Sequence, residues 1–283
     1  MLDDPLDLCA RLAWEIAPSR CRVDPARGES CAWHHGLWPI LRLLRLNTSP
    51  ARSSAFYGEA LGMLGPSPQL LISGSADYAM FAVALAALRS RAVEPRIGMV
   101  DLCETPLVLT RWYAEREKSA VSTWQADILD FASVESFDTL CTDSFLGQFP
   151  AEERGGLIAR WRSLLRPGGL AITVNRLRPD ADPAMRIVFS EEQARELVAT
   201  VSKGAATLPF RVAPDELAPR AAAYAARQGA WPVRSAEEIR GLFESNGFQI
   251  ERLTVARAAG TPCGSAPTLW SGAPYAHVVA RRT

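Results

Sequence analysis

Gly74 and Asp101 are the two residues whose types and spacing most clearly predict chemistry. Gly74 follows an apolar run at residues 70–73 and precedes an alanine-rich segment at 79–89. Glycine suits a strand-to-helix turn that a ligand approaches closely, because it tolerates backbone conformations that other residues avoid. Asp101 ends the next apolar run, roughly one βαβ unit of about 30 residues later. A carboxylate there can accept both hydroxyls of a ribose, so the pair predicts a site for an adenosine-containing ligand.

The glycine turn lacks the pattern of a dinucleotide-binding loop. That loop reads G-x-G-x-x-G, and its glycines let the backbone reach a pyrophosphate. Here Gly74 is flanked by Ser73, Ser75 and Ala76. A ligand with adenosine but without a pyrophosphate therefore fits better.

The elements that must position these residues alternate between strand and helix. We expect strands at 69–73, 96–100, 121–125, 136–141 and 169–175. We expect helices at 77–89, 105–118 and 151–165, and two last strands from GFQIERLTVA and AHVVARR. Such alternation predicts an α/β fold with a parallel sheet covered on both faces.

In this order the motifs resemble those of the class I S-adenosylmethionine-dependent methyltransferases. ISGSAD stands at the cofactor glycine loop, VDLCE at the ribose acid, QADIL at the adenine acid and LCTDSF at the fourth strand. LLRPGGLAITVNR, at 164–176, is the most family-specific stretch, and the resemblance covers about residues 65–180. It implies a Rossmann-like, seven-stranded, mostly parallel sheet with helices on both faces. The chain departs from the family at the glycine loop, where Ser75 and Asp77 or their neighbours replace the usual further glycines.

The resemblance also implies S-adenosylmethionine as the cofactor and a set of residues around it. These are Ser73, Gly74, Ser75, Asp77, Asp101, Leu102, Asp127, Ile128, Thr142, Asp143, Ser144 and Phe145. Three of the acids have ordinary alternatives: Asp77 and Asp101 as helix caps, and Asp127 as a loop acid. The chain lacks Asn or Asp followed by Pro-Pro and an aromatic residue, the amine-methylating signature of nucleic-acid enzymes. Nucleic acid is therefore not expected as a substrate.

Residues 1–64 precede the first strand and are expected to form a helical cap over the cofactor mouth. Apolar residues in 33–44 recur every three to four positions, which predicts an amphipathic helix that Pro39 kinks or restarts. Residues 65–283 would form the cofactor-binding domain, with a helical lid inserted at about 180–234. Ser190 and Ser235 have the types and spacing of helix N-caps.

The catalytic candidates are His34, Tyr78, Asp143 and Asn175. A histidine or a carboxylate could act as a general base, and an aromatic face could stabilise a sulfonium cation. For the histidines and aromatic residues, packing is the competing interpretation. The residues expected in the cap or against the substrate are Trp33, His35, Trp38, Arg42 and Tyr57.

Composition limits the possible partners. The chain has 283 residues, 48% hydrophobic, with 31 basic and 31 acidic residues. This balance predicts a packed globular core and no general attraction to nucleic acid or an anionic membrane. The six cysteines contain no C-x-x-C pair and there are only three histidines, so the spacing predicts no metal site. The cysteine pattern predicts reduced thiols. The N-terminus is acidic and lacks a positive segment followed by an apolar one, which predicts a cytoplasmic protein. No pattern indicates an oligomeric state.

Three functions fit this sequence. The leading hypothesis is methyl transfer from S-adenosylmethionine to a small metabolite. The cap, the Trp-His-His cluster and the SGSADY and CETPL motifs also look similar to synthases that cyclise the cofactor itself to azetidine-2-carboxylate and methylthioadenosine. A non-catalytic cofactor-binding module is the third hypothesis, motivated by the altered glycine loop. Space for a separate acceptor beyond the sulfonium would favour methyl transfer.

Overall fold

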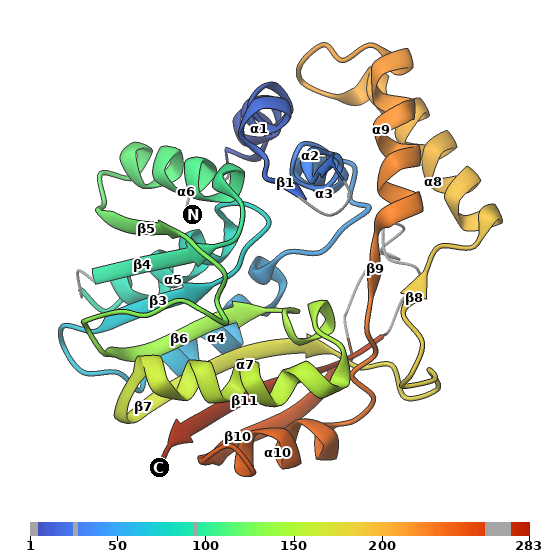
Figure 1. The fold of residues 1–283 in the computed structure, drawn as a ribbon. Coiled ribbons are helices and arrows are strands. Elements are labelled where there is room, and N and C mark those ends of the chain that lie inside the picture. The colour runs from blue at the N-terminus through green and yellow to red at the C-terminus, as the bar shows by residue number, and fades with distance from the viewer. Residues whose placement is uncertain (1–4, 25–27, 93–95, 258–272) are drawn as a thin grey trace.

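A seven-stranded sheet forms the centre of the computed structural model, which describes residues 5–24, 28–92, 96–257 and 273–283 (Figure 1). Its order is β10-β11-β7-β6-β3-β4-β5. The strands are β3 Gln69–Ser73, β4 Arg96–Asp101, β5 Val121–Gln125, β6 Phe137–Asp143, β7 Leu165–Arg176, β10 Phe248–Arg257 and β11 Pro274–Arg282. The five strands from β3 to β7 are parallel, and β11 runs antiparallel to both of its neighbours. The predicted fold class is confirmed.

The order of the strands reverses between β3 and β6. From β3 the chain moves outward through β4 to β5, then returns to place β6 on the other side of β3. Ligands of open α/β sheets bind in the crevice outside the strand ends at such a switch point. The predicted glycine loop and the Asp143 loop leave these two strands and therefore lie at the crevice.

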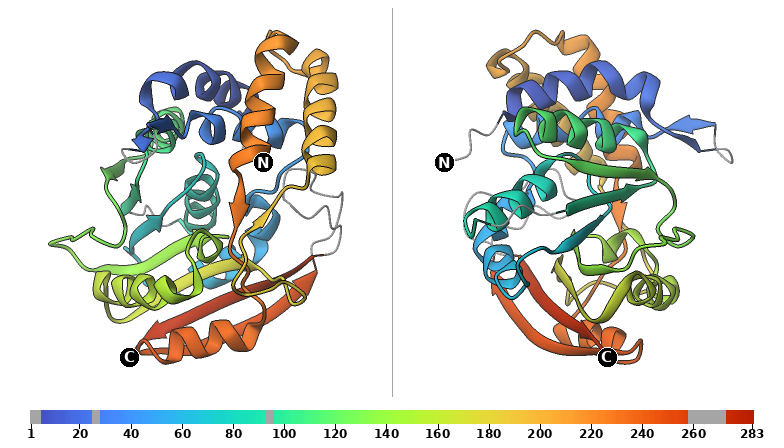
Figure 2. Two further views of the ribbon diagram at one scale, coloured as in Figure 1. Left: turned by 45° about the vertical axis from the view of Figure 1, so that its right-hand side comes forward. Right: turned by 90° about the vertical axis from the view of Figure 1, so that its left-hand side faces the viewer.

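Helices cover both faces of the sheet because its buried side chains alternate along each strand. On one face, Leu70 and Ile72 pack in a cluster with side chains of α4 Ser54–Leu61, α5 Ala79–Arg89 and α6 Glu104–Arg116. On the other face, Leu71 packs in a cluster with side chains of α7 Ala151–Leu164 and α10 Ala236–Glu244. Figures 1 and 2 show these layers on opposite sides of the sheet.

The N-terminal segment and the 180–234 insertion pack on each other rather than forming separate covers. Their helices are α1 Leu6–Arg20, α2 Ala32–His35, α3 Trp38–Leu43, α8 Glu191–Gly204 and α9 Pro214–Arg227. Leu37, Ile40 and Leu41 share one buried cluster with Val201 and Leu217. Figure 2 shows α8 and α9 standing side by side beside the N-terminal helices. The cap and the lid thus have a common core.

Short elements complete the chain. They are the strands β1 Val23–Asp24, β2 Glu29–Ser30, β8 Ile187–Val188 and β9 Gly229–Ala230, and the 3-10 turns η1 Pro50–Ser53, η2 Leu146–Gln148 and η3 Ala205–Thr207. β1 pairs with β2, and β8 pairs with β9. No helix among the described residues is long and apolar enough to span a membrane.

Local sequence signals explain several element ends. Ser190 and Gln193 form a reciprocal capping box at α8, and the Ser235 hydroxyl accepts from the Glu238 amide at α10, as predicted. Pro39 is the second residue of α3, so a new helix starts here and the proline does not kink a continuous one. One boundary differs from expectation: α4, inside the expected cap, packs against α5 in the body of the fold.

Arg154 joins three segments on the α7 face. Its guanidinium donates to Glu238 at 2.7 Å, to the Pro232 carbonyl at 2.9 Å and to the Leu146 and Phe149 carbonyls at 3.2 Å, and its side chain is 2% exposed. Burial lowers the pKa of this arginine, and Glu238 opposes that shift. α7, α10 and the loop after β6 are therefore held by one buried cation.

Replacing Arg154 by alanine should lower the free energy of unfolding by about 3 kcal/mol, because a partly buried carboxylate and several carbonyls lose their donor. Chemical denaturation followed by circular dichroism measures this change. Arg195→Ala is the matched control: its ion pair with Glu191 is on the surface, so an effect below about 0.5 kcal/mol is expected. Equal stabilities of the two variants would contradict this role of Arg154.

Candidate functional site

A cavity of about 440 Å³ lies at the switch point between the sheet and the capping helices. Its size is within the range of small-molecule sites. The sheet side is lined by residues that follow strand ends: Gly74, Ser75, Ala76, Asp77, Asp101, Asp143, Ser144, Phe145 and Asn175. The capping side includes Trp33, His34, His35, Trp38, Tyr224, Gln228 and Trp231. The predicted cofactor loop and the predicted cap residues therefore meet in one cavity.

Gly74 has a backbone conformation that few other residues adopt. Its φ is +71°, and its amide donates to the Val100 carbonyl of the next strand at 2.9 Å. A Cβ at this position would lie 2.3 Å from Cε2 of Phe145. Glycine is therefore required here both by the left-handed turn and by the aromatic ring against it. The predicted glycine turn is present, but the group that lies close to Gly74 is the Phe145 ring of the protein itself.

Asp101 holds two loops with its carboxylate. Oδ2 accepts from the Ser75 amide at 3.0 Å and Oδ1 accepts from the Cys103 amide at 2.8 Å. Burial raises the pKa of Asp101 from 3.8 to about 6, and these two amides oppose the shift. Each oxygen has a second lone pair, so the carboxylate can still accept hydroxyl donors from the cavity. The alternative of a helix cap is compatible with the bond from the Cys103 amide, because Cys103 is the residue before α6.

Asp77 caps the turn before α5 and is paired with Arg42. Its Oδ1 accepts from the Ala79 amide at 2.8 Å, and its Oδ2 accepts from the Arg42 guanidinium at 2.5 Å. Both side chains of this ion pair are at most 6% exposed. Arg42 also lies over the ring of Tyr78, 5.6 Å from its centre. In this structure Arg42 therefore contacts a carboxylate of the protein, and capping is the observed role of Asp77.

Asp143 is oriented by two hydroxyl groups. Tyr57 donates to its Oδ2 at 3.0 Å and to the Thr142 carbonyl at 2.8 Å, and Ser144 donates to its Oδ1 at 3.0 Å. Ser144 has φ +53°, an uncommon value for a residue with a side chain, directly beside the cavity. Burial raises the pKa of Asp143 from 3.8 to about 6. This carboxyl group can exchange a proton close to neutral pH.

His34 is less suited to base catalysis than Asp143. Its ring stacks on Tyr224 with 5.9 Å between centres and lies 5.0 Å from Trp38. Burial, with a smaller effect of His35, lowers the pKa of His34 to about 3. A base is most effective when its pKa is near the working pH. In this environment His34 remains neutral and helps to form the aromatic wall of the cavity.

Several predicted site residues do not line the cavity. Tyr78 is 2% exposed and stacks on Tyr113 at 4.5 Å in the core, so it does not line the cavity. Asp127 caps its own turn through the Leu129 amide at 2.9 Å. Ser73 and Thr142 are buried and joined by a hydrogen bond, and Ile128 is in the core. Leu102 is 43% exposed. Tyr57 does not line the cavity but hydrogen-bonds to Asp143, which does.

Asn175 lines the cavity, but its side-chain amide forms hydrogen bonds with other groups of the protein. Its Oδ1 accepts from the Leu146 amide at 3.2 Å and its Nδ2 donates to Thr173 at 2.9 Å. It therefore positions η2, the turn that follows Asp143, rather than presenting a free amide.

Three arginines of the cavity wall were not predicted. Arg176 ends β7, and Arg178 and Arg186 follow it in the segment that leads to the lid. Burial lowers the pKa of Arg178 to about 10, and the positive charge of Arg176 contributes to this shift. The N-R-L-R sequence at residues 175–178, where the fifth parallel strand ends, was the available signal, because that end of a parallel strand borders the crevice.

No protein-family model matches this chain, and no curated protein matches it in sequence. Solved structures do match. The [4+2]-cyclase SpnF superposes with a TM-score of 0.54 at 13% identity, over 98% of this chain and 93% of its own. Magnesium protoporphyrin IX methyltransferase from Synechocystis PCC 6803 superposes at 0.51 and 13% identity, over 99% and 97%. A S-adenosylmethionine-dependent methyltransferase from Methanosarcina mazei superposes at 0.51 and 15% identity, over 78% and 95%.

The fold is that of the S-adenosylmethionine-dependent methyltransferases. The Synechocystis protein was crystallised with S-adenosylhomocysteine bound. Identities this low establish the fold and leave the reaction to the residues of the site.

Asp101→Ala should weaken the binding of S-adenosylhomocysteine at least about tenfold, because each hydrogen bond to a charged group contributes about 1.5 to 3 kcal/mol. Isothermal titration calorimetry measures the dissociation constant. Asp130→Ala, which removes an exposed acid from another loop, serves as the control with unchanged affinity. An unchanged constant in Asp101→Ala would remove this carboxylate from the ligand site.

The preference for S-adenosylmethionine over S-adenosylhomocysteine should depend on pH. A sulfonium near Asp143 favours the ionised carboxylate, so the preference should fall as the pH drops below about 6, by up to about tenfold per pH unit. Taking the ratio of the two dissociation constants cancels the effect of Asp101, because both ligands carry the same ribose. Asp143→Asn should make the ratio independent of pH. A constant ratio in the unchanged protein between pH 5 and 8 would refute the assignment.

Proposed function

We propose that this protein transfers the methyl group of S-adenosylmethionine to a small metabolite that carries an anionic group. The cofactor would supply an activated methyl group. The observation that carries the proposal is the two-sided cavity, in which the Gly74–Asp101–Asp143 side faces a second side made by the cap, the lid and three arginines.

The residues of the first side fit an adenosine ligand. Asp101 retains lone pairs toward the cavity, and the loop from Ser73 to Asp77 supplies a tight backbone turn beside it. Asp143 lies on the adjacent strand end, where a carboxylate can attract a positive sulfur. These positions support binding by the same crevice that the fold uses in general.

The second side fits an acceptor. Trp33, Trp38 and Trp231 offer apolar faces, and Arg176 and Arg178 offer positive charge. An anionic group here would form charge-assisted hydrogen bonds with guanidinium groups. The cyclisation of the cofactor itself would need no such second side, which favours a separate acceptor.

The chain contributes mainly alignment and proton transfer. Methyl transfer requires the acceptor, the methyl carbon and the sulfur in line, so the two sides of the cavity act through proximity. The carboxylate of Asp143 can take the proton of a hydroxyl or ammonium acceptor, and Tyr57 and Ser144 keep its oxygens in place. Closure by the capping helices would exclude water.

Incubation of the pure protein with S-adenosylmethionine alone, followed by mass spectrometry, separates the three hypotheses. Methyl transfer predicts no turnover until an acceptor is added, and then one S-adenosylhomocysteine for each methylated product. Methylthioadenosine from the cofactor alone would instead establish cyclisation.

A panel of small carboxylic acids paired with their primary amides then tests the acceptor class. We expect turnover with an acid and a loss of about tenfold or more with its amide, and Arg178→Gln should reduce that difference while leaving S-adenosylhomocysteine affinity unchanged. Turnover with amides alone would refute the anionic acceptor. Cofactor binding without any turnover across a broad panel of acceptors would favour the binding module.

A further inference from the structure

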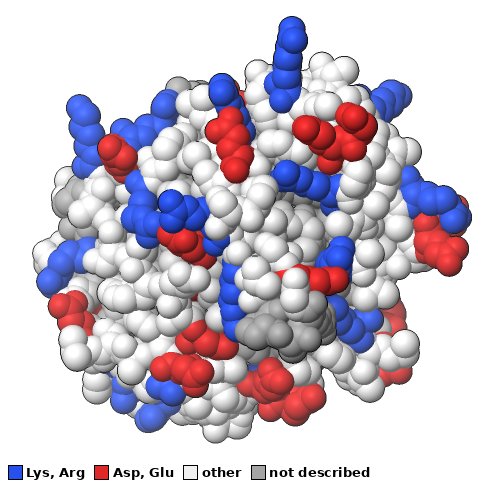
Figure 3. Space-filling view, turned by 45° about the horizontal axis from the view of Figure 1, so that its top comes forward, with Lys and Arg blue, Asp and Glu red and all other residues white. Residues whose placement is uncertain are grey.

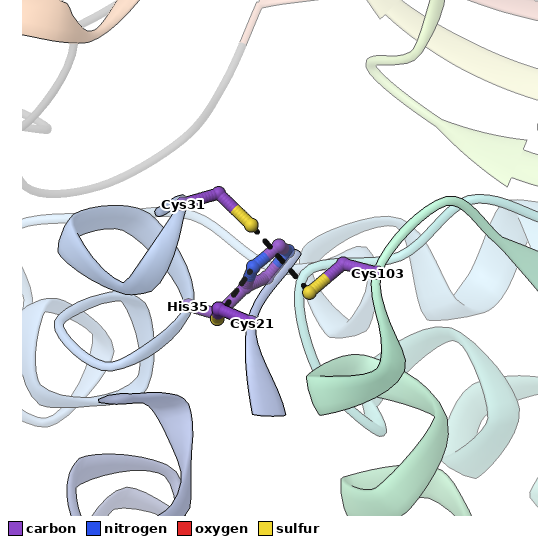
Figure 4. A group of neighbouring side chains, drawn as sticks. All are labelled: Cys21, Cys31, His35 and Cys103. Atoms are coloured by element: carbon purple, nitrogen blue, oxygen red, sulfur yellow. Dashed lines mark hydrogen bonds between the residues drawn. The ribbon is translucent and has the colours of Figure 1, made fainter. Parts of the chain in front are cut away.

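Four residues with metal-binding side chains converge beneath the cap. Cys21 follows α1, Cys31 precedes α2, His35 ends α2, and Cys103 follows β4. One ligand atom from each lies within 4.8 Å of every other. Figure 4 shows their sulfur atoms and imidazole directed toward one another. The spacing argument did not find this group, because Cys103 is far from the other three in the sequence.

The distances match the edges of a tetrahedron around zinc. Zinc–sulfur bonds of about 2.3 Å and zinc–nitrogen bonds of about 2.0–2.1 Å place two sulfurs about 3.8 Å apart, and a sulfur and a nitrogen about 3.6 Å apart. Here the Cys31 and Cys103 sulfurs are 3.5 Å apart, and the Cys21 sulfur is 3.6 Å from Nδ1 of His35. These two edges are close to the tetrahedral lengths, and the other donor atoms lie within 4.8 Å of one another.

The surroundings suit a four-ligand structural site at the edge of the cavity, which Cys31 and His35 also line. Cys21, His35 and Cys103 are buried and Cys31 is half-buried. The Thr105 hydroxyl lies 3.1 Å from the Cys21 sulfur, where it can donate to a thiolate. Such outer partners stabilise the ligands of protein metal sites.

The elements that carry the ligands are short, and the apolar core between them is small. β1 and β2 are two residues each and α2 is a single turn. The buried apolar cluster at this point consists of Ala17, Cys21 and Cys103, with Cys31 and Ala32 packed against it. Very small cores are commonly stabilised by a metal, because they bury too little apolar surface.

We propose that Cys21, Cys31, His35 and Cys103 bind a structural zinc ion that fastens the cap to the cofactor site. Three thiolates and one imidazole form one of the usual structural zinc sets. Binding replaces the thiol protons, which leave to solvent, and involves no change of oxidation state. The ion would fix the Cys103 loop, whose amide donates to Asp101. The cap would thereby be linked to the carboxylate expected to bind ribose.

Metal analysis of the protein purified from zinc-supplemented cells without chelator tests this proposal. We expect about one zinc per chain, and tetrahedral d–d absorption with sulfur-to-metal charge transfer when cobalt replaces the zinc. These measurements do not require catalytic activity, so they remain decisive if the proposed function is wrong.

Variants assign the ligands. Cys31→Ser and Cys103→Ser should each lose the charge-transfer intensity of one thiolate and bind zinc at least about a hundredfold more weakly. Cys9→Ala is the matched control, because Cys9 is a buried cysteine of α1 outside the group, and it should keep the full metal content. If a serine variant does not fold, the number of thiolates per cobalt in the unchanged protein still tests the ligand set.

Three results would overturn the proposal. The first is zinc well below one equivalent together with no tetrahedral cobalt spectrum. The second is full metal content in both serine variants. The third is a peptide map of the native protein that contains a Cys31–Cys103 disulfide in place of bound metal.

Discussion

The carboxylate of Asp101 is the interaction on which the site depends. It lies at the end of β4 and accepts one amide from the loop after β3 and another from the loop before α6. Two neighbouring strand ends are thereby joined through one partly buried carboxylate. The two amides also fix the orientation of the side chain, which lines the cavity. The glycine turn and the Cys103 loop are both bonded to Asp101, and residues of the cap line the same cavity as its carboxylate.

Asp143, at the end of β6 on the other side of β3, is also a carboxylate held in place by hydrogen bonds. Its two oxygens are each held by a hydroxyl, one from Tyr57 on α4 and one from Ser144. Neither hydroxyl neutralises the carboxyl group, so burial leaves its pKa near 6 rather than near 4. Asp77 illustrates the contrast, because Arg42 forms an ion pair with it. The cavity therefore holds one carboxylate that is fully paired and two that can respond to a ligand.

The capping layer is built from segments that lie far apart in the sequence. Residues of α3 share a buried core with α8 and α9, and the Arg227 guanidinium of α9 reaches Glu29 of β2 at 2.8 and 3.0 Å. The face shown in Figure 3 carries scattered basic and acidic side chains among uncharged ones. This shared core and the ion pair join the N-terminal segment and the lid in one layer. Its attachment to the sheet then matters for binding, and the proposed zinc ligands lie at that attachment.

The sequence by itself determined the sheet, the alternation of helices, the glycine turn and the carboxylate of Asp101 at the end of β4. These depend on local signals: apolar periodicity, capping residues, and the type of residue that ends a strand. Only the tertiary structure decided that Tyr78 is core, that Arg42 pairs with Asp77, and that Arg176 and Arg178 face the cavity. It also brought Cys103 to the three ligands of the cap. Such contacts join residues far apart in the chain, and their geometry follows from how whole layers pack, which no local pattern records.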